Sequence, residues 1–373
     1  MTKRPQLAYN IKLYRKKAGY TRSKLAKLIN YSEKSIEKWE MGKSVPPLFV
    51  ICELSEILGV SIETLIYGEY NEIIYFLGIN GDGNSTEFIL VDAVGNEVAK
   101  CRRSTANPLY VGMDSCTAVL KSGIDHICAG IERHKISAFI GISGINPENQ
   151  TKISRIVSEF GFGYFEIGSD VDNAIEIALQ GDDGIVVILG SGCIAISMHN
   201  GVKERIGGWG YLIDSGGSTY SIARDALEAV FKSIDGRGDE TLLHEIFTRK
   251  LGHAPESVVP LLYELGKPNI ASYCSAVFEA AELGDHTAVS ILKKNSLFIA
   301  ELIEASLDKY SAAVPRVVIC GTLALERAVL EPLIKEAMSS GVSIEFEARE
   351  LVFGATQLAK KRWLASNTEP RLY

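Results

Sequence analysis

The chain has 373 residues, of which 46% are hydrophobic and 23% are charged, as in a soluble globular protein with room for two or three domains. Its seven cysteines are odd in number and have no paired spacing, which argues against a disulfide framework, a structural zinc site and an iron–sulfur site. The N-terminus lacks a secretory apolar segment, and the longest uncharged run, GIVVILGSGCIAISM, is too short to span a bilayer. We therefore expect a cytoplasmic protein without a membrane partner.

The net charge of −7 conceals two oppositely charged parts. Residues 1–68 carry 12 lysines and arginines against six acidic residues, whereas the remainder carries 27 against 40. A basic end on an acidic body suggests that the two parts meet different partners. A solvated helical surface would have the same excess of basic residues, so the charge alone does not show that this part binds a partner.

The basic end has a helical pattern. Apolar residues at helical spacing predict helices over 11–20, 21–30, 32–42, 49–59 and 61–68. Thr21 and Ser32 are residue types that cap helices, and Asn30 with Tyr31 forms the turn between the second and third. Trp39 faces inward and leaves lysines outside. Two short helices joined by a tight turn form a helix-turn-helix, whose second helix fits the major groove of DNA.

The order T-x-x-x-L-A…S-x-x-S-I-x-x-W-E-x-G-x-x-x-P closely resembles the Cro/C1 (XRE-type) DNA-binding family over about residues 8–66. The resemblance implies a small all-α, lambda-repressor-like domain that binds double-stranded DNA as a homodimer. It assigns DNA contacts to Arg22, Lys34, Ser35, Lys38 and Lys43, the first and last on phosphates. Arg22 stands where the family commonly has glutamine, and Glu40 is expected to be a structural cap or ion-pair residue. A helical protein-interaction module of the same fold is the alternative.

From residue 73 the periodicity changes to that of an α/β protein. Strands are predicted over 73–80, 86–92, 96–104, 137–143, 164–168, 184–190, 193–198, 202–208 and 316–321. Helices are predicted over 111–133, 147–160, 169–181, most of 217–310, and from 322 to the end. Two halves that each begin with strand, glycine turn and strand suggest an internal duplication.

This layout is similar to the actin/hexokinase-type ATPase fold (ASKHA, duplicated ribonuclease-H-like), a two-lobed α/β body. We expect the DNA-binding domain at 1–68, a short linker at 69–73 and the body at 74–373. Lobe one would span about 74–180 plus the C-terminal helix at 353–365, and lobe two about 181–352. Phosphate would lie between the hairpins GINGDGNST (78–86) and LGSGC (189–193), because amides in glycine turns form an anion nest. The predicted nucleotide-binding residues are Gly81, Gly83, Ser85, Thr86, Gly190, Ser191, Gly192 and Gly321.

More specific motifs occur in order: T-A-N-P at 105–108, S-G at 143–144, Asp170 after a strand, and GGWGYLIDSGGSTYSIARDAL at 207–227. Together with VFKSIDGRGDETLLHEIF they resemble the N-acetylglucosamine kinase family, related to the BadF/BadG-type ATPases, over roughly 74–365. The resemblance implies ATP as the phosphoryl donor and Mg²⁺ as a cofactor. It also implies that Asp170 is the general base that takes a proton from the sugar hydroxyl. It implies sugar contacts from Asn107, Ser143, Gly144, Gly208 and Trp209. None of the six histidines has metal-ligand spacing, so no metal site is predicted.

Three departures from the family pattern bear on activity. The first loop reads G-I-N-G-D-G-N-S in place of G-x-D/E-G-G-G-T-[KR], so neutral Asn80 replaces the acid that directs Mg²⁺. Asp82 adds a charge that would repel phosphate unless a metal or a turned geometry absorbs it. The second loop has Ser191 where threonine is usual. After GGWG the chain reads D-S-G-G-S (214–218), and losing the family's aspartate there removes a hydrogen bond worth about 1.5–3 kcal/mol.

Two functions remain open from the sequence. One is a transcription regulator whose kinase-like body senses an amino sugar or cell-wall fragment, with phosphoryl transfer weakened or lost. The other is an active amino-sugar kinase that regulates its own operon. A cluster-bearing activator ATPase is disfavoured because Cys101, Cys116 and Cys128 are dispersed, and a ROK-type repressor because its cysteine-rich zinc motif is missing.

Overall fold

The computed structural model describes residues 7–67, 73–214, 216–260, 270–310 and 315–368. The chain divides into two compact units, Met1–Glu72 and Ile73–Tyr373, and each is described by itself. The predicted linker at 69–73 lies outside the described residues, except for Ile73. No helix of the described residues has the length and apolar character needed to cross a membrane.

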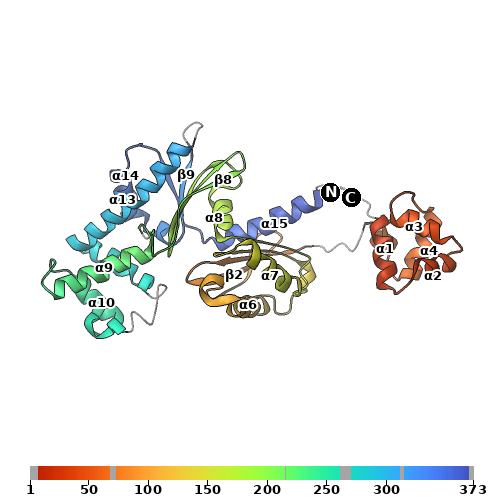
Figure 1. The fold of residues 1–373 in the computed structure, drawn as a ribbon, viewed down its shortest axis with the longest axis horizontal. Coiled ribbons are helices and arrows are strands. Elements are labelled where there is room, and N and C mark those ends of the chain that lie inside the picture. Colours follow the sequence, from red (N-terminus) through yellow and green to blue (C-terminus); the bar gives the residue numbers. More distant parts are fainter. Residues whose placement is uncertain (1–6, 68–72, 215, 261–269, 311–314, 369–373) are drawn as a thin grey trace. The chain divides into compact units, whose positions relative to one another are not determined.

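The first unit is all-helical in its described part (Figure 1). Its helices are α1 (Leu7–Lys17), α2 (Arg22–Leu28), α3 (Glu33–Glu40), α4 (Leu48–Leu58) and α5 (Ile62–Tyr67). Thr21 caps α2 by accepting a hydrogen bond from the amide of Lys24, and Ser32 caps α3 in the same way from Ser35. Asn30 takes the left-handed conformation (φ 54°) in the turn between the two helices. The predicted helix-turn-helix is therefore present.

The first sheet of the second unit has the order β3-β2-β1-β4-β5. Its strands are β1 (Tyr75–Gly81), β2 (Ser85–Asp92), β3 (Glu97–Ser104), β4 (Ile136–Ile142) and β5 (Tyr164–Gly168). The first three form an antiparallel meander, whereas β1, β4 and β5 run parallel. Helices α6 (Pro108–Ile127) and α7 (Pro147–Ser158) and a 3₁₀ turn at Arg133–Lys135 complete this lobe. Parallel strands bring their carboxyl ends to one edge, which is where ligands bind in such sheets.

The second sheet has the order β10-β9-β6-β7-β8 and the same pattern of directions. Its strands are β6 (Gly184–Leu189), β7 (Cys193–His199), β8 (Val202–Gly207), β9 (Val317–Cys320) and β10 (Ile344–Glu347). The predicted duplication is therefore present strand by strand. The prediction that only helices follow the strand at 316–321 was wrong, because β10 pairs with β9 as β5 pairs with β4.

Lobe two also contains five of the nine α-helices described in the second unit. They are α9 (Thr219–Ile234), α10 (Leu243–Leu251), α12 (Cys274–Glu282), α13 (His286–Lys309) and α14 (Arg327–Ala337), with 3₁₀ turns at Pro255–Val258 and Thr322–Glu326. Helices α9 and α13 pack side by side, and their buried apolar residues share one core with the second sheet. This core gives lobe two a rigid base for the loops at its strand ends.

Two helices lie between the sheets, α8 (Asp170–Leu179) and α15 (Val352–Thr368), as Figure 1 shows. Helix α8 buries Ala174 and Ala178 against the second sheet, and α15 buries Leu358 against the first. The two helices touch through their backbones, since a Cβ added at Gly354 would lie 2.0 Å from the carbonyl oxygen of Asn173. Both sheets are thereby joined at one tightly packed centre.

Candidate functional site

The lysines predicted to meet DNA lie on α3 and just beyond its end. Lys34, Lys38 and Lys43 are exposed, and none of them forms an ion pair with another described residue. Ser35 is tied to the helix cap, because its hydroxyl lies 2.8 Å from that of Ser32. The lysines are therefore available to neutralise phosphates, whereas the hydroxyl of Ser35 already has a partner.

Glu40 joins three helices through a buried charge cluster. Its carboxylate accepts hydrogen bonds from Arg15 Nε (2.5 Å) and Arg15 Nη2 (3.2 Å) and from Arg22 Nε (2.8 Å). The Glu40 side chain is completely buried. Burial raises its pKa, but the hydrogen bonds from Arg15 and Arg22 outweigh that effect, and the net pKa is lowered. Glu40 is thus an ion-pair residue, and it fixes the position of Arg22.

In the second unit, the carboxyl ends of β1, β4 and β5 meet at one edge of the first sheet. The amide of Ser143, after β4, donates to the carbonyl oxygen of Gly81, at the end of β1 (2.7 Å). Asn173 on α8 donates from Nδ2 to Asn80 Oδ1 (2.9 Å), which ties α8 to β1. The predicted sugar loop, the first glycine loop and the start of α8 therefore form one connected structure.

The structure brings three of the predicted sugar residues together. Asn107 caps α6, with Oδ1 accepting from the amide of Leu109 (2.9 Å), and it donates from Nδ2 to Ser143 Oγ (3.0 Å). Gly144 lies against the side-chain amide of Asn107, because a Cβ added at Gly144 would be 2.3 Å from Asn107 Oδ1. Only 5% of Asn107 is exposed. A close-fitting polar corner of this kind is typical of a site that orients a small hydroxylated ligand.

Asp170 begins α8, two residues after the end of β5. Ser169 caps the helix in a capping box with Asp172, so the carboxylate of Asp170 is not needed for that purpose. Burial raises the pKa of Asp170 to about 7, and the nearby charge of Asp82 adds to the effect. A carboxylate with a pKa near neutrality is suited to accept a proton, as the predicted base would.

The first glycine loop folds onto its own acid. Asp82 Oδ1 accepts from the amides of Asn84 (2.7 Å) and Ser85 (2.8 Å), and the amide of Asp82 donates to the carbonyl oxygen of Ser85 (2.9 Å). Thr86 is completely buried, and its hydroxyl accepts from the amide of Ala106 (2.8 Å) instead of facing the cleft. The backbone amides of the turn therefore stabilise the negative charge of Asp82. Thr86 holds the segment before Asn107 in place.

The residues of this loop do not fit magnesium. Asn80 is 5% exposed, and its side-chain oxygen already accepts from Asn173. The described residues contain no group of three or more histidine, cysteine, aspartate or glutamate side chains that could hold a metal ion. Mg²⁺ prefers carboxylate and water ligands in a regular octahedron. The loop as folded is therefore a poor site for this ion.

The second glycine loop is open. The amide of Gly190 donates to the carbonyl oxygen of Gly192 (2.9 Å), but the amides of Ser191 and Gly192 have no hydrogen-bond partner in the described chain. The two loops face each other, because a Cβ added at Gly83 would lie 3.0 Å from Ser191 Oγ. Gly321 adjoins the second loop, where an added Cβ would lie 2.7 Å from the carbonyl oxygen of Leu189. The predicted phosphate and adenosine turns are therefore neighbours.

The glycine-tryptophan loop lies on the second sheet. Gly208 has φ 71°, and an added Cβ would lie 2.8 Å from the side chain of Ile194, so only glycine fits there. Trp209 is 66% exposed, and the Arg205 guanidinium carbon lies 3.8 Å from the centre of its ring. The amide of Trp209 donates to Asp214 Oδ2 (3.2 Å), so Asp214 supports the loop backbone. No hydrogen bond between described residues joins this loop to Asn107 or Asp170.

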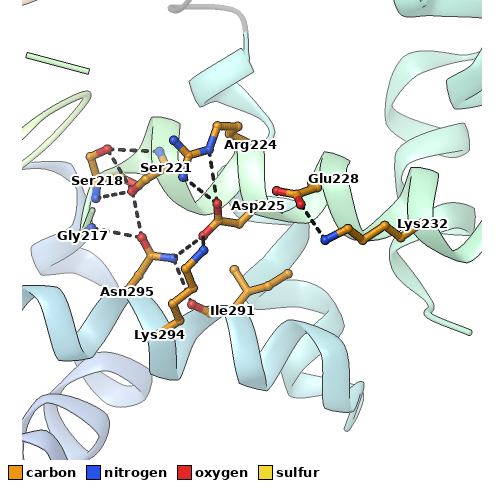
Figure 2. Close-up of polar contacts among 10 residues, drawn as sticks. All are labelled: Gly217, Ser218, Ser221, Arg224, Asp225, Glu228, Lys232, Ile291, Lys294 and Asn295. Carbon is orange, nitrogen blue, oxygen red and sulfur yellow. Dashed lines mark hydrogen bonds and ion pairs between the residues drawn. The ribbon is translucent and has the colours of Figure 1, made fainter. Parts of the chain in front are cut away.

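A buried polar network holds the end of this loop (Figure 2). Asn295 on α13 accepts at Oδ1 from the amide of Gly217 (3.0 Å) and from Ser221 Oγ (2.8 Å). Its Nδ2 donates to Asp225 Oδ2 (3.3 Å) on α9. Ser215, which replaces one of the family's two acids, lies outside the described residues. The segment that follows it is held by the side-chain amide of Asn295.

Asp225 draws two cations into the same network, as Figure 2 shows. Arg224 Nη2 donates to Oδ1 (2.7 Å) and Lys294 Nζ to Oδ2 (2.9 Å). Burial raises the pKa of Asp225, but these hydrogen bonds outweigh it, and the net pKa is lowered. A cavity of about 380 Å³ adjoins the network, lined by Gly216, Arg224, Asp225, Lys294, Asn295, Leu297, Phe298 and Glu301. It does not include the predicted sugar residues.

Some residues beside the predicted site were not foreseen from the sequence. Tyr110 on α6 and Tyr211 in the glycine-tryptophan loop lie close enough to interact, since the pKa of Tyr110 is raised by burial and then by Tyr211. Asn173, which ties α8 to the first loop, was also missed. Tyr110 lies two residues after the T-A-N-P motif, and Tyr211 directly follows GGWG. This proximity is the sequence signal that could have identified both tyrosines.

Comparison with known proteins agrees with this architecture. The family model described as the BadF/BadG/BcrA/BcrD ATPase family matches residues 77–354, and a helix-turn-helix model matches residues 11–65. The chain is 29% identical to the N-acetyl-D-glucosamine kinase of Dictyostelium discoideum over 253 residues, covering 63% of this chain and 79% of that protein. It is 27% identical to the N-acetylmuramic acid/N-acetylglucosamine kinase of Clostridium acetobutylicum over 256 residues, covering 66% and 83%.

Solved structures resemble the second unit in fold. A candidate N-acetylglucosamine kinase from Chromobacterium violaceum aligns with a TM-score of 0.62 and 22% identity, over 77% of this chain and 99% of that one. A ROK-family glucokinase from Streptomyces griseus aligns with a TM-score of 0.55 and 13% identity, over 77% and 99%. At these identities the likeness shows the fold alone, which is the predicted actin/hexokinase type. Because the family match spans most of its length, the chain belongs to the BadF/BadG/BcrA/BcrD ATPase family, and it carries a helix-turn-helix domain ahead of the family domain.

Proposed function

We propose that this protein is a DNA-binding transcription regulator whose sugar-kinase-like body senses an amino sugar or a cell-wall-derived sugar, with phosphoryl transfer weakened or lost. One observation carries the proposal. The polar corner of Asn107, Ser143 and Gly144 is assembled, while the first glycine loop has Asn80 in place of an acid and is folded around Asp82. The cleft thus has the predicted sugar-binding corner, while its first glycine loop lacks the acid that would direct Mg²⁺ in phosphoryl transfer.

The ligand class follows from the relatives and the site. The similar proteins of D. discoideum and C. acetobutylicum are named as kinases of N-acetylglucosamine and, for the second, N-acetylmuramic acid. Asn107 offers an amide and Ser143 a hydroxyl to sugar hydroxyls, and the exposed ring of Trp209 offers an apolar face to the C–H surface of a pyranose. Asp170 would accept a hydrogen bond from the hydroxyl that kinases phosphorylate.

The DNA-binding role rests on the first unit. Its lysines on and beyond α3 are exposed, and Glu40 holds Arg22 beside them. Regulators of this class bind operator half-sites as dimers, so we expect a homodimer. Ligand binding in the body would then change DNA affinity by favouring one arrangement of the dimer.

The experiment is a DNA-binding titration with and without sugar. Duplexes selected from a random library by the purified full-length protein are labelled, and their binding is measured by fluorescence anisotropy at low salt. N-acetylglucosamine and N-acetylmuramic acid are then added, with glucose as the control. A shift in affinity with an amino sugar is the expected result. Absence of DNA affinity under every condition would remove the proposal, as would affinity that no sugar changes.

The second candidate is an active amino-sugar kinase that also regulates its own operon. The observation in its favour is that burial raises the pKa of Asp170 to about 7, a value that would suit a general base. ATP-dependent phosphorylation of N-acetylglucosamine, with Asp170→Asn as the control, tests it. Turnover that this substitution abolishes would favour the kinase. A cluster-bearing activator is not supported, since Cys116 and Cys128 are buried and burial raises the pKa of each to about 11.

A further inference from the structure

We infer that Asp82 is an internal anion that occupies the phosphate position of the first glycine loop and so excludes nucleoside triphosphates from the cleft. The inference rests on the proposed function, because it concerns the same cleft, and it goes further by naming the residue that separates sensing from phosphoryl transfer. It also names the ligand class that is excluded.

The hydrogen bonds of the loop carry the first step. An anion nest works by offering several adjacent backbone amides to one anion. Here the carboxylate of Asp82 receives two of them, from Asn84 and Ser85, and the amide of Asp82 itself is bonded to the carbonyl of Ser85. Among residues 82–85, only the amide of Gly83 has no partner within the described chain. A phosphate oxygen entering this loop would have to displace the carboxylate.

The second loop supplies an internal comparison. The amides of Ser191 and Gly192 have no partner among the described residues, and Cβ atoms added at Gly190 and Gly192 would meet nothing within 4 Å. The loop sequence 189–193 contains no acid. The two loops occupy equivalent places in the duplicated fold. Backbone amides of the second loop are open to an anion, whereas two of those in the first loop are already bonded to the Asp82 carboxylate.

The charges around the first loop also oppose binding of a nucleoside triphosphate. The first loop has no lysine or arginine. The guanidinium of Arg102 reaches the loop from β3, where it donates to Ser85 Oγ (3.1 Å) and pairs with Glu87 (3.3 Å). The carboxylate of Asp82 also lies close enough to Asp170 to raise its pKa. An incoming triphosphate would thus meet the carboxylate of Asp82, joined by that of Asp170 when Asp170 is ionised, in a partly desolvated site where like charges repel more strongly than in water.

The test is nucleotide binding by the full-length protein, measured by isothermal titration calorimetry with ATP and ADP, each with and without Mg²⁺. The variant is Asp82→Ala, since Asp82 is not at a positive φ and alanine fits its backbone. The matched control is Asp92→Ala. Asp92 makes the same kind of turn in the next hairpin, with Oδ1 accepting from Val94 (3.0 Å) and Asn96 (2.9 Å), but at a half-buried position at the other end of β2.

We expect no nucleotide binding by the wild type or Asp92→Ala up to about 1 mM. Asp82→Ala should bind roughly tenfold to a hundredfold more tightly, the range for one or two charge-assisted contacts. Wild-type affinity equal to that of Asp82→Ala would overturn the inference, as would a folded Asp82→Ala without gain. Should that variant not fold, Asp82→Gly restores the glycine of the family loop and is judged by the same criterion.

The failure of this inference can be distinguished from failure of the proposed function. Sugar-dependent DNA binding is measured on the same wild-type protein without nucleotide. Nucleotide binding by the wild type with an intact sugar response refutes the role of Asp82 alone. A gain in Asp82→Ala without any sugar response of DNA binding refutes the sensing role alone.

Discussion

The substitution Glu40→Gln tests how the DNA-binding unit is held together. Glu40 is completely buried and receives two hydrogen bonds from Arg15 and one from Arg22. Glutamine has nearly the same shape but carries no charge, and its amide nitrogen would face a guanidinium. Arg15, which is 7% exposed, would then keep a buried positive charge without its counter-ion.

Removing one partner of a buried ion pair costs about 3–5 kcal/mol. Small domains have a free energy of unfolding of only about 5–15 kcal/mol, with the smallest at the low end. The substitution should therefore remove most of the stability of α1–α5 and raise the population of the opened unit by about 10²- to 5 × 10³-fold. Because Arg22 loses its support as well, DNA affinity should fall together with stability.

Amide hydrogen exchange of the full-length protein, read by mass spectrometry, measures this change locally. Peptides from 7–67 should exchange on the order of a hundredfold faster in Glu40→Gln, whereas peptides from the second unit should be unchanged. The control is Glu33→Gln on the same helix, where the side chain is exposed. Since the pKa of Glu40 is lowered in the folded state, its contribution is present at neutral pH and is lost as the pH falls through that lowered value. Exchange within twofold of the control would refute the reasoning.

Three further predictions concern the two units. Gly144→Ala should abolish sugar binding measured by calorimetry, because its Cβ would collide with Asn107, whereas Gly130→Ala, with nearly the same φ (76°) but open space, should not. Asp170→Asn should raise the melting temperature at pH 8 but not near pH 4, because a raised pKa means that the contribution of the protonated form is lost as the pH rises through about 7. An equal change at both pH values would contradict it. Lys38→Ala should reduce the slope of log affinity against log salt by about one, and an unchanged slope would mean that Lys38 meets no phosphate.

Much of the fold could be predicted because its signals are local. Helix caps depend on one side chain and the next few amides, and both Thr21 and Ser32 cap the helices that the sequence indicates. The two meanders are recognised from alternating apolar residues and glycine turns. Strand β10 was missed because it is short and follows a helical segment, yet the duplication itself requires a counterpart to β5 at that place.

The details of the site depended on contacts between distant segments. Thr86 lies in the predicted phosphate loop, but its burial against the segment before Asn107 follows from packing that no local pattern reveals. The turn around Asp82 was foreseen only as one way to absorb its charge. The exposure of Trp209 and the pairing of Asn173 with Asn80 depend on how the lobes and the central helices meet. Sequence periodicity predicts which face of a helix or strand a side chain lies on, but it does not predict which residue of a distant segment that side chain contacts.

The glycines of the cleft are weaker indicators of activity than the charged positions beside them. A Cβ added at Gly81 would lie 2.5 Å from the side chain of Ile142, and one at Gly144 would lie 2.3 Å from Asn107. Packing of the lobe demands these glycines whether or not a nucleotide ever binds. Asn80 is also held by packing, because it is buried and accepts a hydrogen bond from Asn173. Asp82 is half-buried, and within the described chain its carboxylate is bonded only to amides of its own loop, so no packing between segments fixes its charge. A cleft can therefore keep its outline after its reaction is lost, and the side chains that are free to change are the ones that report on function.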